Sequence, residues 1–199
     1  MTSAAALAGY AADAEVLIPR YRTIDSEALY APVLDLLSEA PGAALDVGAG
    51  TGRDADWLAR RGWRVTAVEP VAAFRGVCGG TAVEWIDGRL PDLAPALAGR
   101  RFELVIVNAV WQHLDDAERA RSVGPLVRTL ASGGLLVLSI RHGPGAPSRP
   151  VHPASAEDAV ALFEAEGLTC VRRVETDSIQ PENRAAGVRW TWLGFRRGA

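Results

Sequence analysis

The chain has 199 residues, of which 49% are hydrophobic and 23% are charged, and its formal net charge is −3. No apolar run reaches the roughly 20 residues of a membrane-spanning helix, and the 21 basic residues, all arginine, are scattered among acids. We therefore expect a cytoplasmic protein that binds neither a membrane nor nucleic acid, and the absence of lysine excludes a lysine base, a Schiff base and a P-loop.

Short apolar runs alternate with amphipathic stretches, which predicts βαβ units and a mainly parallel sheet. The Ala-rich N-terminus predicts a helix. A further helix is predicted over residues 26–39, where Leu29, Val33, Leu36 and Leu37 share one face. Six or seven strands are expected, at residues 43–48, 64–69, 82–86, 102–107, 135–140, 168–175 and 188–195.

Helices are predicted between the strands at residues 53–61, 115–130 and 155–166. Asp115 and Ser155 are suited to cap the last two of these. The final two strands are joined only by a polar loop, residues 178–187. They are therefore expected to form an antiparallel pair at a sheet edge, which makes the fold class α/β with a mostly parallel sheet.

The strongest functional signal lies where the first predicted strand ends. Glycines follow it at 48, 50 and 52, and a helix begins at once. Such glycines allow a tight turn and a close approach of the backbone to a ligand, and the helix N-terminus offers free N–H groups. The second strand ends in Glu69, whose carboxylate can accept hydrogen bonds from both hydroxyls of a ribose.

The glycine spacing separates two kinds of cofactor. A dinucleotide-binding GxGxxG beginning at Gly48 would need glycine at position 53, where Arg53 stands. The pattern here is GxGxG, and Asp46 precedes it by two residues. An acidic side chain beside the loop fits a cofactor with a cationic amino-acid end better than a pyrophosphate.

This Asp-x-Gly-x-Gly-x-Gly segment, with Glu69, Asp87 and the Gly133-Gly134 pair in order after it, resembles the class I S-adenosylmethionine-dependent methyltransferases. The resemblance runs from about residue 43 to the end. It implies a Rossmann-like three-layer sandwich with a seven-stranded sheet, and S-adenosylmethionine as cofactor, with S-adenosylhomocysteine as product. It also implies a single domain, with residues 1–42 as a helical lid segment on a core of residues 43–199.

The same resemblance assigns cofactor contacts to matching positions. The glycine loop would pass the methionine part and the ribose, Glu69 would hold the ribose, and Asp87 would accept a hydrogen bond from the adenine. Asp46 and Asp87 as plain turn residues, and Arg53 as a solvated helix residue, are the alternatives. The cofactor-binding candidates are Asp46, Gly48, Ala49, Gly50, Gly52, Arg53, Glu69, Pro70, Asp87, Gly88, Asn108 and Tyr21.

The acceptor side is expected after the fourth and fifth strands. His113 is the candidate general base, since an imidazole titrates near neutrality, although it could also pack or cap the next helix. Trp111 would line the pocket or lie in the core. Arg141 and His142, at the carboxyl end of the fifth strand, would contact a polar group of the acceptor or belong to a surface loop.

Asn108-Ala109-Val110-Trp111 lacks the Asn/Asp-Pro-Pro-aromatic motif of enzymes that methylate amino groups of adenine or glutamine. The expected activity is methyl transfer to an oxygen or nitrogen of an unidentified small molecule, by in-line displacement without a metal, in a monomer or homodimer. A protein or RNA methyltransferase, a non-methylating nucleotide-binding member of the fold and an NAD-dependent dehydrogenase are the alternatives.

Overall fold

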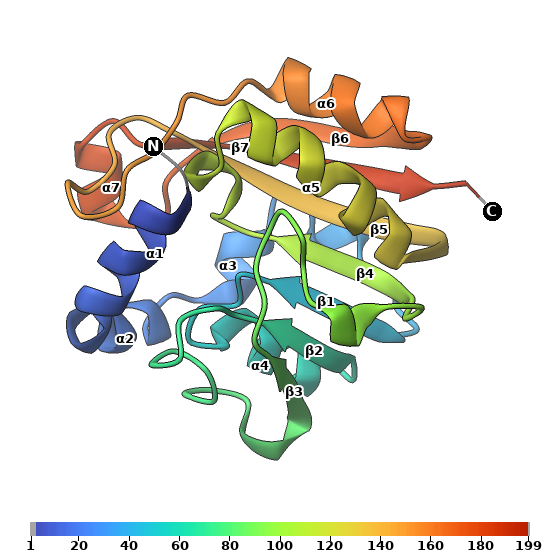
Figure 1. Cartoon of the computed structure of the whole chain (residues 1–199), viewed down its shortest axis with the longest axis horizontal. Coiled ribbons are helices and arrows are strands. Elements are labelled where there is room, and N and C mark those ends of the chain that lie inside the picture. The colour runs from blue at the N-terminus through green and yellow to red at the C-terminus, as the bar shows by residue number, and fades with distance from the viewer. Residues whose placement is uncertain (1–2, 199) are drawn as a thin grey trace.

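The computed structural model of the chain describes residues 3–198. Its centre is a seven-stranded sheet in the order β3-β2-β1-β4-β5-β7-β6 (Figure 1). Strands β1 to β5 run parallel, and β7 is antiparallel to both β5 and β6, which confirms the predicted class and the antiparallel pair. The strands are β1 (Ala43–Val47), β2 (Arg64–Val68), β3 (Val83–Ile86), β4 (Phe102–Val107), β5 (Leu130–His142), β6 (Leu168–Asp177) and β7 (Arg189–Arg197).

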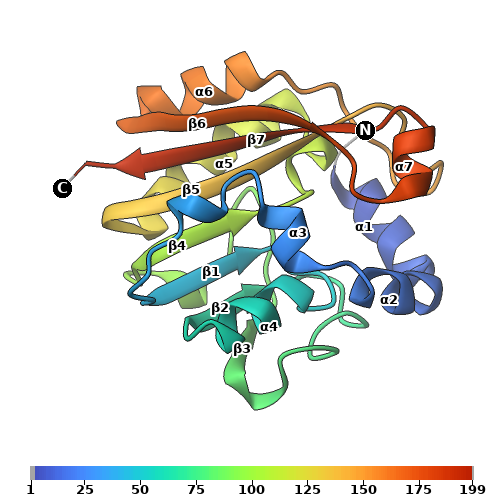
Figure 2. The same cartoon turned by 180° about the vertical axis from the view of Figure 1, so that it is seen from behind.

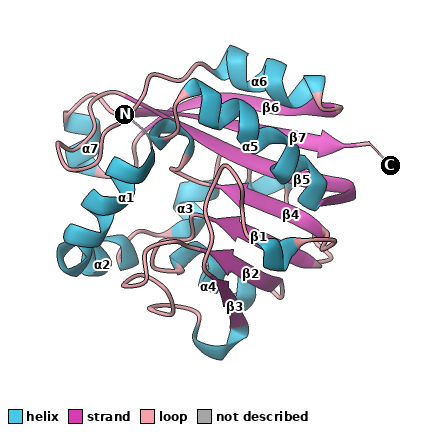
Figure 3. Cartoon of the chain, viewed as in Figure 1, coloured by secondary structure: helices cyan, strands magenta, loops and turns pink. Residues whose placement is uncertain are grey.

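Helices cover both faces of the sheet, which gives three layers (Figures 2 and 3). Helices α5 (Asp116–Thr129) and α6 (Ala156–Ala165) pack on one face, and α3 (Ser26–Tyr30) and α4 (Arg53–Arg60) pack on the other. Each face has its own apolar core, the second one built around Tyr30, stacked 5.1 Å from Trp57. Within residues 3–198, no helix is both long and apolar enough to cross a membrane.

Two sequence-based predictions of secondary structure are wrong. The helix expected over residues 26–39 ends at Tyr30, and a 3-10 turn, Leu34–Leu36, follows. Pro32 explains the break, since proline lacks the N–H of a helix and clashes with the preceding turn. The polar loop between the last two strands contains a short helix, α7 (Pro181–Ala185), with the proline in its first turn.

Helices α1 (Ser3–Ala12) and α2 (Ala14–Arg22) lie across the carboxyl ends of the parallel strands (Figure 1). The Ser3 hydroxyl donates to Glu118 of α5 over 2.7 Å. Gly9 lies so close to the loop after β5 that a Cβ there would meet the Ser148 carbonyl oxygen at 1.7 Å. These contacts fix α1 between α5 and that loop, so the sheet edge where parallel sheets bind ligands is covered.

One buried carboxylate ties three segments together behind this edge. Asp54, 6% exposed, receives two hydrogen bonds from its neighbour Arg53, at 2.8 and 2.7 Å. It also accepts from the hydroxyls of Ser26 at 2.8 Å and Tyr30 at 3.0 Å, and from the Asn108 amide at 3.2 Å. Burial by itself would raise the pKa of Asp54, but the Arg53 charge and these hydrogen bonds outweigh it and lower the pKa.

Asp54→Asn tests how much this network contributes. The substitution keeps the shape and removes the charge, which leaves the Arg53 guanidinium buried without a counter-ion. We expect the free energy of unfolding, measured by urea denaturation, to fall by about 3–5 kcal/mol.

The matched control is Asp56→Asn, in the same helix, because Asp56 pairs with Arg60 at the surface. There the loss should stay below about 1 kcal/mol. Equal losses in the two variants would contradict a special role for Asp54.

Candidate active site

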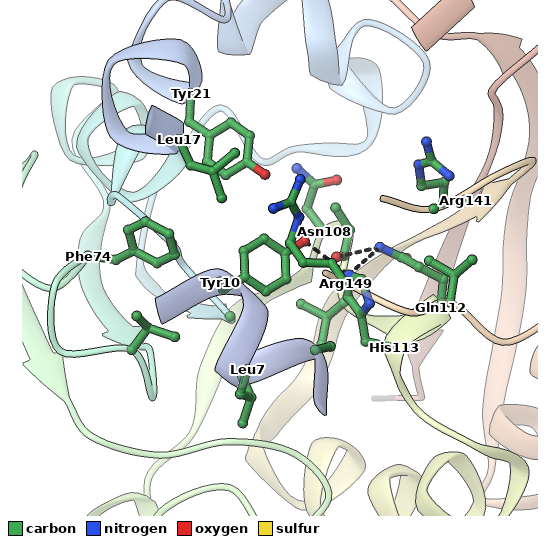
Figure 4. Close-up of a pocket in the computed structure, with 18 of the residues that line it drawn as sticks. Leu7, Tyr10, Leu17, Tyr21, Phe74, Asn108, Gln112, His113, Arg141 and Arg149 are labelled. Carbon is green, nitrogen blue, oxygen red and sulfur yellow. Dashed lines mark hydrogen bonds between the residues drawn. The ribbon is translucent and has the colours of Figure 1, made fainter. Parts of the chain in front are cut away.

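A cavity of about 470 Å³ opens at the carboxyl ends of β1, β2, β4 and β5, beneath α1 and α2 (Figure 4). This volume lies in the usual range of small-ligand sites. Ten of the sixteen predicted site residues line this cavity, which joins segments from the first to the last third of the chain. Its lining includes Tyr10, Leu17, Arg20, Tyr21, Gly48, Ala49, Gly50, Arg53, Glu69, Pro70, Phe74, Arg89, Asn108, Gln112, His113, Arg141, Arg149 and Trp190.

The glycine loop forms the floor on one side. Gly48 has φ +72, and a Cβ there would lie 2.4 Å from the Val110 side chain, so a larger residue does not fit. Gly50 has φ +53 with open space on its Cβ side, which leaves room for a ligand against the backbone. Gly52 does not line the cavity, because its Cβ side is filled by Trp85 at 2.5 Å.

Glu69 ends β2 beside this loop and is 4% exposed. Its two carboxylate oxygens accept from the backbone N–H groups of Gly50 at 2.8 Å and Val71 at 2.7 Å. Each oxygen keeps one further lone pair for a ligand hydroxyl. Burial raises the pKa of Glu69, and the two backbone hydrogen bonds oppose that rise.

Asp46 lies on β1 just before the loop and is 2% exposed, outside the lining of the cavity. Its Oδ2 accepts no hydrogen bond from the described residues. Burial, followed by the negative charge of Asp54, raises the pKa of Asp46 well above its usual range. A positive charge near this carboxylate oxygen would stabilise the ionised form of Asp46.

Asn108 follows β4 and lines the cavity with its side chain already engaged. Its Oδ1 accepts from the Ser139 hydroxyl at 2.7 Å, and its amide donates to Asp54. The same hydroxyl receives a hydrogen bond from the backbone N–H of Ala109 at 2.8 Å. Ala109 has φ +58, a strained conformation for alanine, and this turn directs the following segment into the cavity.

That segment carries His113, in the 3-10 turn Trp111–His113. The His113 Nδ1 lies 2.9 Å from the Pro150 carbonyl oxygen, which can only accept, so Nδ1 carries the proton. Nε2 is then the acceptor, with the Tyr10 hydroxyl at 3.0 Å and the Gln112 amide nitrogen at 3.2 Å (Figure 4). Burial lowers the pKa of His113 below 6.5, and the charges of Arg141 and Arg149 lower it further.

The two residues at the end of β5 point in different directions, as neighbours on a strand do. Arg141 lines the cavity, where its guanidinium donates to the carbonyl oxygens of Gly143 and Pro144. His142 lies outside the lining and forms a 2.7 Å hydrogen bond with the Thr191 hydroxyl of β7. Only Arg141 of this pair can reach a ligand.

Three other candidates also lie outside the cavity. Asp87 is exposed and faces Arg75, with 3.3 Å between carboxylate and guanidinium. Gly88 has its Cβ side filled by Ala94 at 2.8 Å, so it is required for packing. Trp111 is 1% exposed and packs 5.7 Å from Phe163 in the core, which favours the core interpretation.

Sequence reasoning missed several lining residues. Tyr10 comes from α1, and its ring meets those of Phe74 and His113 edge-on at 6.2 and 5.4 Å. Arg149 lies over the Tyr10 ring, 5.3 Å from its centre, and pairs with Asp13. The rule that loops after parallel strands meet at one edge could have indicated Arg149, but no local pattern marks Tyr10.

Residues 45–138 match the family model of a methyltransferase domain. No curated protein matches the sequence.

Three solved structures share the fold. The 1,6-didemethyltoxoflavin-N1-methyltransferase of Burkholderia thailandensis, with bound 1,6-didemethyltoxoflavin and S-adenosylhomocysteine, is 20% identical, with a TM-score of 0.69 over 96% of this chain and 88% of its own. Magnesium protoporphyrin IX methyltransferase from Synechocystis PCC 6803, with bound cofactor, is 16% identical, with a TM-score of 0.66 over 86% and 77%. The N-methyltransferase NodS from Bradyrhizobium japonicum WM9 is 18% identical, with a TM-score of 0.63 over 92% and 97%.

At these identities the structural likeness shows the fold, and the domain match covers residues 45–138. The glycine loop, Glu69 and the cavity at the carboxyl edge stand where such a fold binds its cofactor. The chain therefore has the fold of S-adenosylmethionine-dependent methyltransferases, and its residues 45–138 match the family model of a methyltransferase domain.

Proposed function

We propose that this enzyme transfers the methyl group of S-adenosylmethionine to an oxygen or nitrogen atom of a small molecule, by in-line displacement without a metal. One observation carries the proposal: the cavity places the glycine loop and Glu69 together with a histidine whose Nε2 accepts hydrogen bonds. The neighbours support a small acceptor, since their names include 1,6-didemethyltoxoflavin and magnesium protoporphyrin IX.

The cofactor side fits S-adenosylmethionine. Glu69 has lone pairs left for the ribose hydroxyls, and Gly50 leaves open space against the backbone. The orphaned oxygen of Asp46 favours the cationic ammonium group of the cofactor near the loop, and such a charge would offset the raised pKa of Asp46. Pro70, Ala49 and Asn108 complete this side of the cavity.

When bound, the cofactor supplies a methyl group on a sulfonium sulfur, which is already an activated leaving group. The protein therefore has to align the acceptor and exclude water. Helices α1 and α2 provide the cover, through Tyr10, Leu17 and Tyr21. We assign residues 1–42 the role of a lid segment on the core of residues 43–199.

His113 acts as the general base in this proposal. Its proton is fixed on Nδ1 by Pro150, and its lowered pKa keeps Nε2 unprotonated near neutral pH. An acceptor O–H or N–H takes the place at Nε2 that the Tyr10 hydroxyl holds in this structure. The acceptor proton passes to Nε2 as the new bond to the methyl carbon forms.

Glu69→Ala tests the cofactor side. The substitution removes the ribose acceptor and two hydrogen bonds that shape the loop, so calorimetric titration should show S-adenosylhomocysteine binding weakened by about 1–3 kcal/mol. The control is Glu84→Gln, whose side chain bonds Arg100 and Thr66 outside the cavity and should leave the affinity unchanged. Unaltered binding by Glu69→Ala, or tight binding of NAD to the wild type, would contradict the assignment.

His113→Asn tests the base. Turnover is followed as S-adenosylhomocysteine release with the first active member of a panel of phenols and amines. In the wild type, kcat/KM should fall as the pH drops through the lowered pKa of His113, below pH 6.5, because only the neutral imidazole accepts a proton.

The variant should turn over about 10²–10⁴ times more slowly and lack this acidic limb, while S-adenosylhomocysteine affinity stays at the wild-type value. Wild-type turnover by His113→Asn would return the residue to a packing role.

A further inference from the structure

We infer that the methyl acceptor is a small organic carboxylate with an apolar body, and that Arg141 binds its carboxylate. This inference rests on the proposed function and deepens it, because it assigns a chemical class to the acceptor.

The lining is strongly basic. Five arginines face the cavity, whereas Glu69 is its one carboxylate among the described residues. Glu69 is already engaged with two backbone N–H groups beside the glycine loop. A bound cofactor adds a sulfonium charge to this set, so a neutral acceptor would leave an excess of positive charge in a confined space.

Most of these arginines have a counter-ion within the protein. Arg53 pairs with Asp54, Arg149 with Asp13 and Arg20 with Glu182. Arg89 has no such partner in residues 3–198, but it is exposed to solvent. Among the lining arginines that are at least partly shielded from solvent, Arg141 is therefore the one without a counter-ion in residues 3–198.

Arg141 is half-buried, and no carboxylate of residues 3–198 lies within ion-pair distance of it. Its hydrogen bonds go to two backbone carbonyl oxygens, of Gly143 and Pro144, which neutralise no charge. Loss of hydration on burial lowers the pKa of its guanidinium. A guanidinium forms paired, charge-assisted hydrogen bonds with a carboxylate, and such an anion would satisfy Arg141.

The opposite side of the cavity is apolar. Figure 4 shows Phe74, Leu17 and Tyr21 on one side and Arg141 with Gln112 on the other. An acceptor that fills both sides has an apolar body and one anionic end.

The reacting atom of such an acceptor falls close to the base. Arg141 and His113 both line the cavity and lie on the same side of it, away from Phe74 (Figure 4). Tyr10 packs on Phe74 and on His113, so it borders both the apolar side and the base. A compact acid whose hydroxyl or amine lies a few bonds from its carboxylate therefore suits the cavity.

The test uses the full-length protein saturated with S-adenosylhomocysteine and calorimetric titration of three matched pairs of probes. These are benzoate, 4-hydroxybenzoate and indole-3-carboxylate, each compared with its own neutral primary amide. At least one carboxylate should bind more than tenfold tighter than its amide. In Arg141→Gln this preference should fall below about threefold, and Arg141→Lys, which keeps the charge, should retain part of it.

Arg101→Gln, at an exposed arginine just before β4, serves as the control and should keep the full preference. The affinity of each variant for S-adenosylhomocysteine is measured first and should equal that of the wild type. This measurement shows that the variants are folded. Amides that bind as well as the acids, a preference that survives Arg141→Gln, or no carboxylate binding at millimolar concentration would overturn the inference. Failure of S-adenosylhomocysteine to bind the wild type would instead overturn the proposed function.

Discussion

The buried carboxylate of Asp54 is the interaction on which the active-site architecture depends. It accepts hydrogen bonds from Arg53 at the start of α4, from Ser26 and Tyr30 in α3 and from Asn108 after β4. A charge can stay buried there only because a guanidinium and three neutral donors surround it. The consequence is geometric: the end of the glycine loop, the N-terminal segment and the end of β4 are held at one point behind the cavity.

A second network fixes the acceptor side in a different way. His113 is held by the Pro150 carbonyl on one ring nitrogen and by Tyr10 and Gln112 on the other. Tyr10 belongs to α1, which Ser3 attaches to Glu118 of α5. The state of the imidazole is therefore coupled to the position of α1. In the mechanism that we propose, the acceptor replaces the Tyr10 hydroxyl at Nε2, so the availability of this lone pair depends on where α1 places Tyr10.

The sequence predicted those features that depend on neighbouring residues. Strand order along the chain, the glycine turn and Glu69 follow from periodicity and spacing within short windows, and the structure has the strands near the predicted bounds. The prediction of one helix over residues 26–39 was wrong, because the apolar residues keep helical spacing beyond Pro32 although the helix ends at Tyr30. The roles of Asp54, Tyr10 and Arg149 could not be predicted, since their partners lie far away in the sequence and depend on tertiary packing.

This difference between local and long-range determinants also separates the two halves of the cavity. The half that we assign to the cofactor is built from a turn, a strand end and the backbone N–H groups that bond Glu69, so it depends mainly on backbone atoms. The acceptor half is built from side chains of α1, the turn after β4 and the loop after β5, such as Tyr10, His113 and Arg141. Side chains on such loops can change without disturbing the sheet. Enzymes that share this fold at 16–20% identity can therefore keep one cofactor and differ in the molecule they methylate.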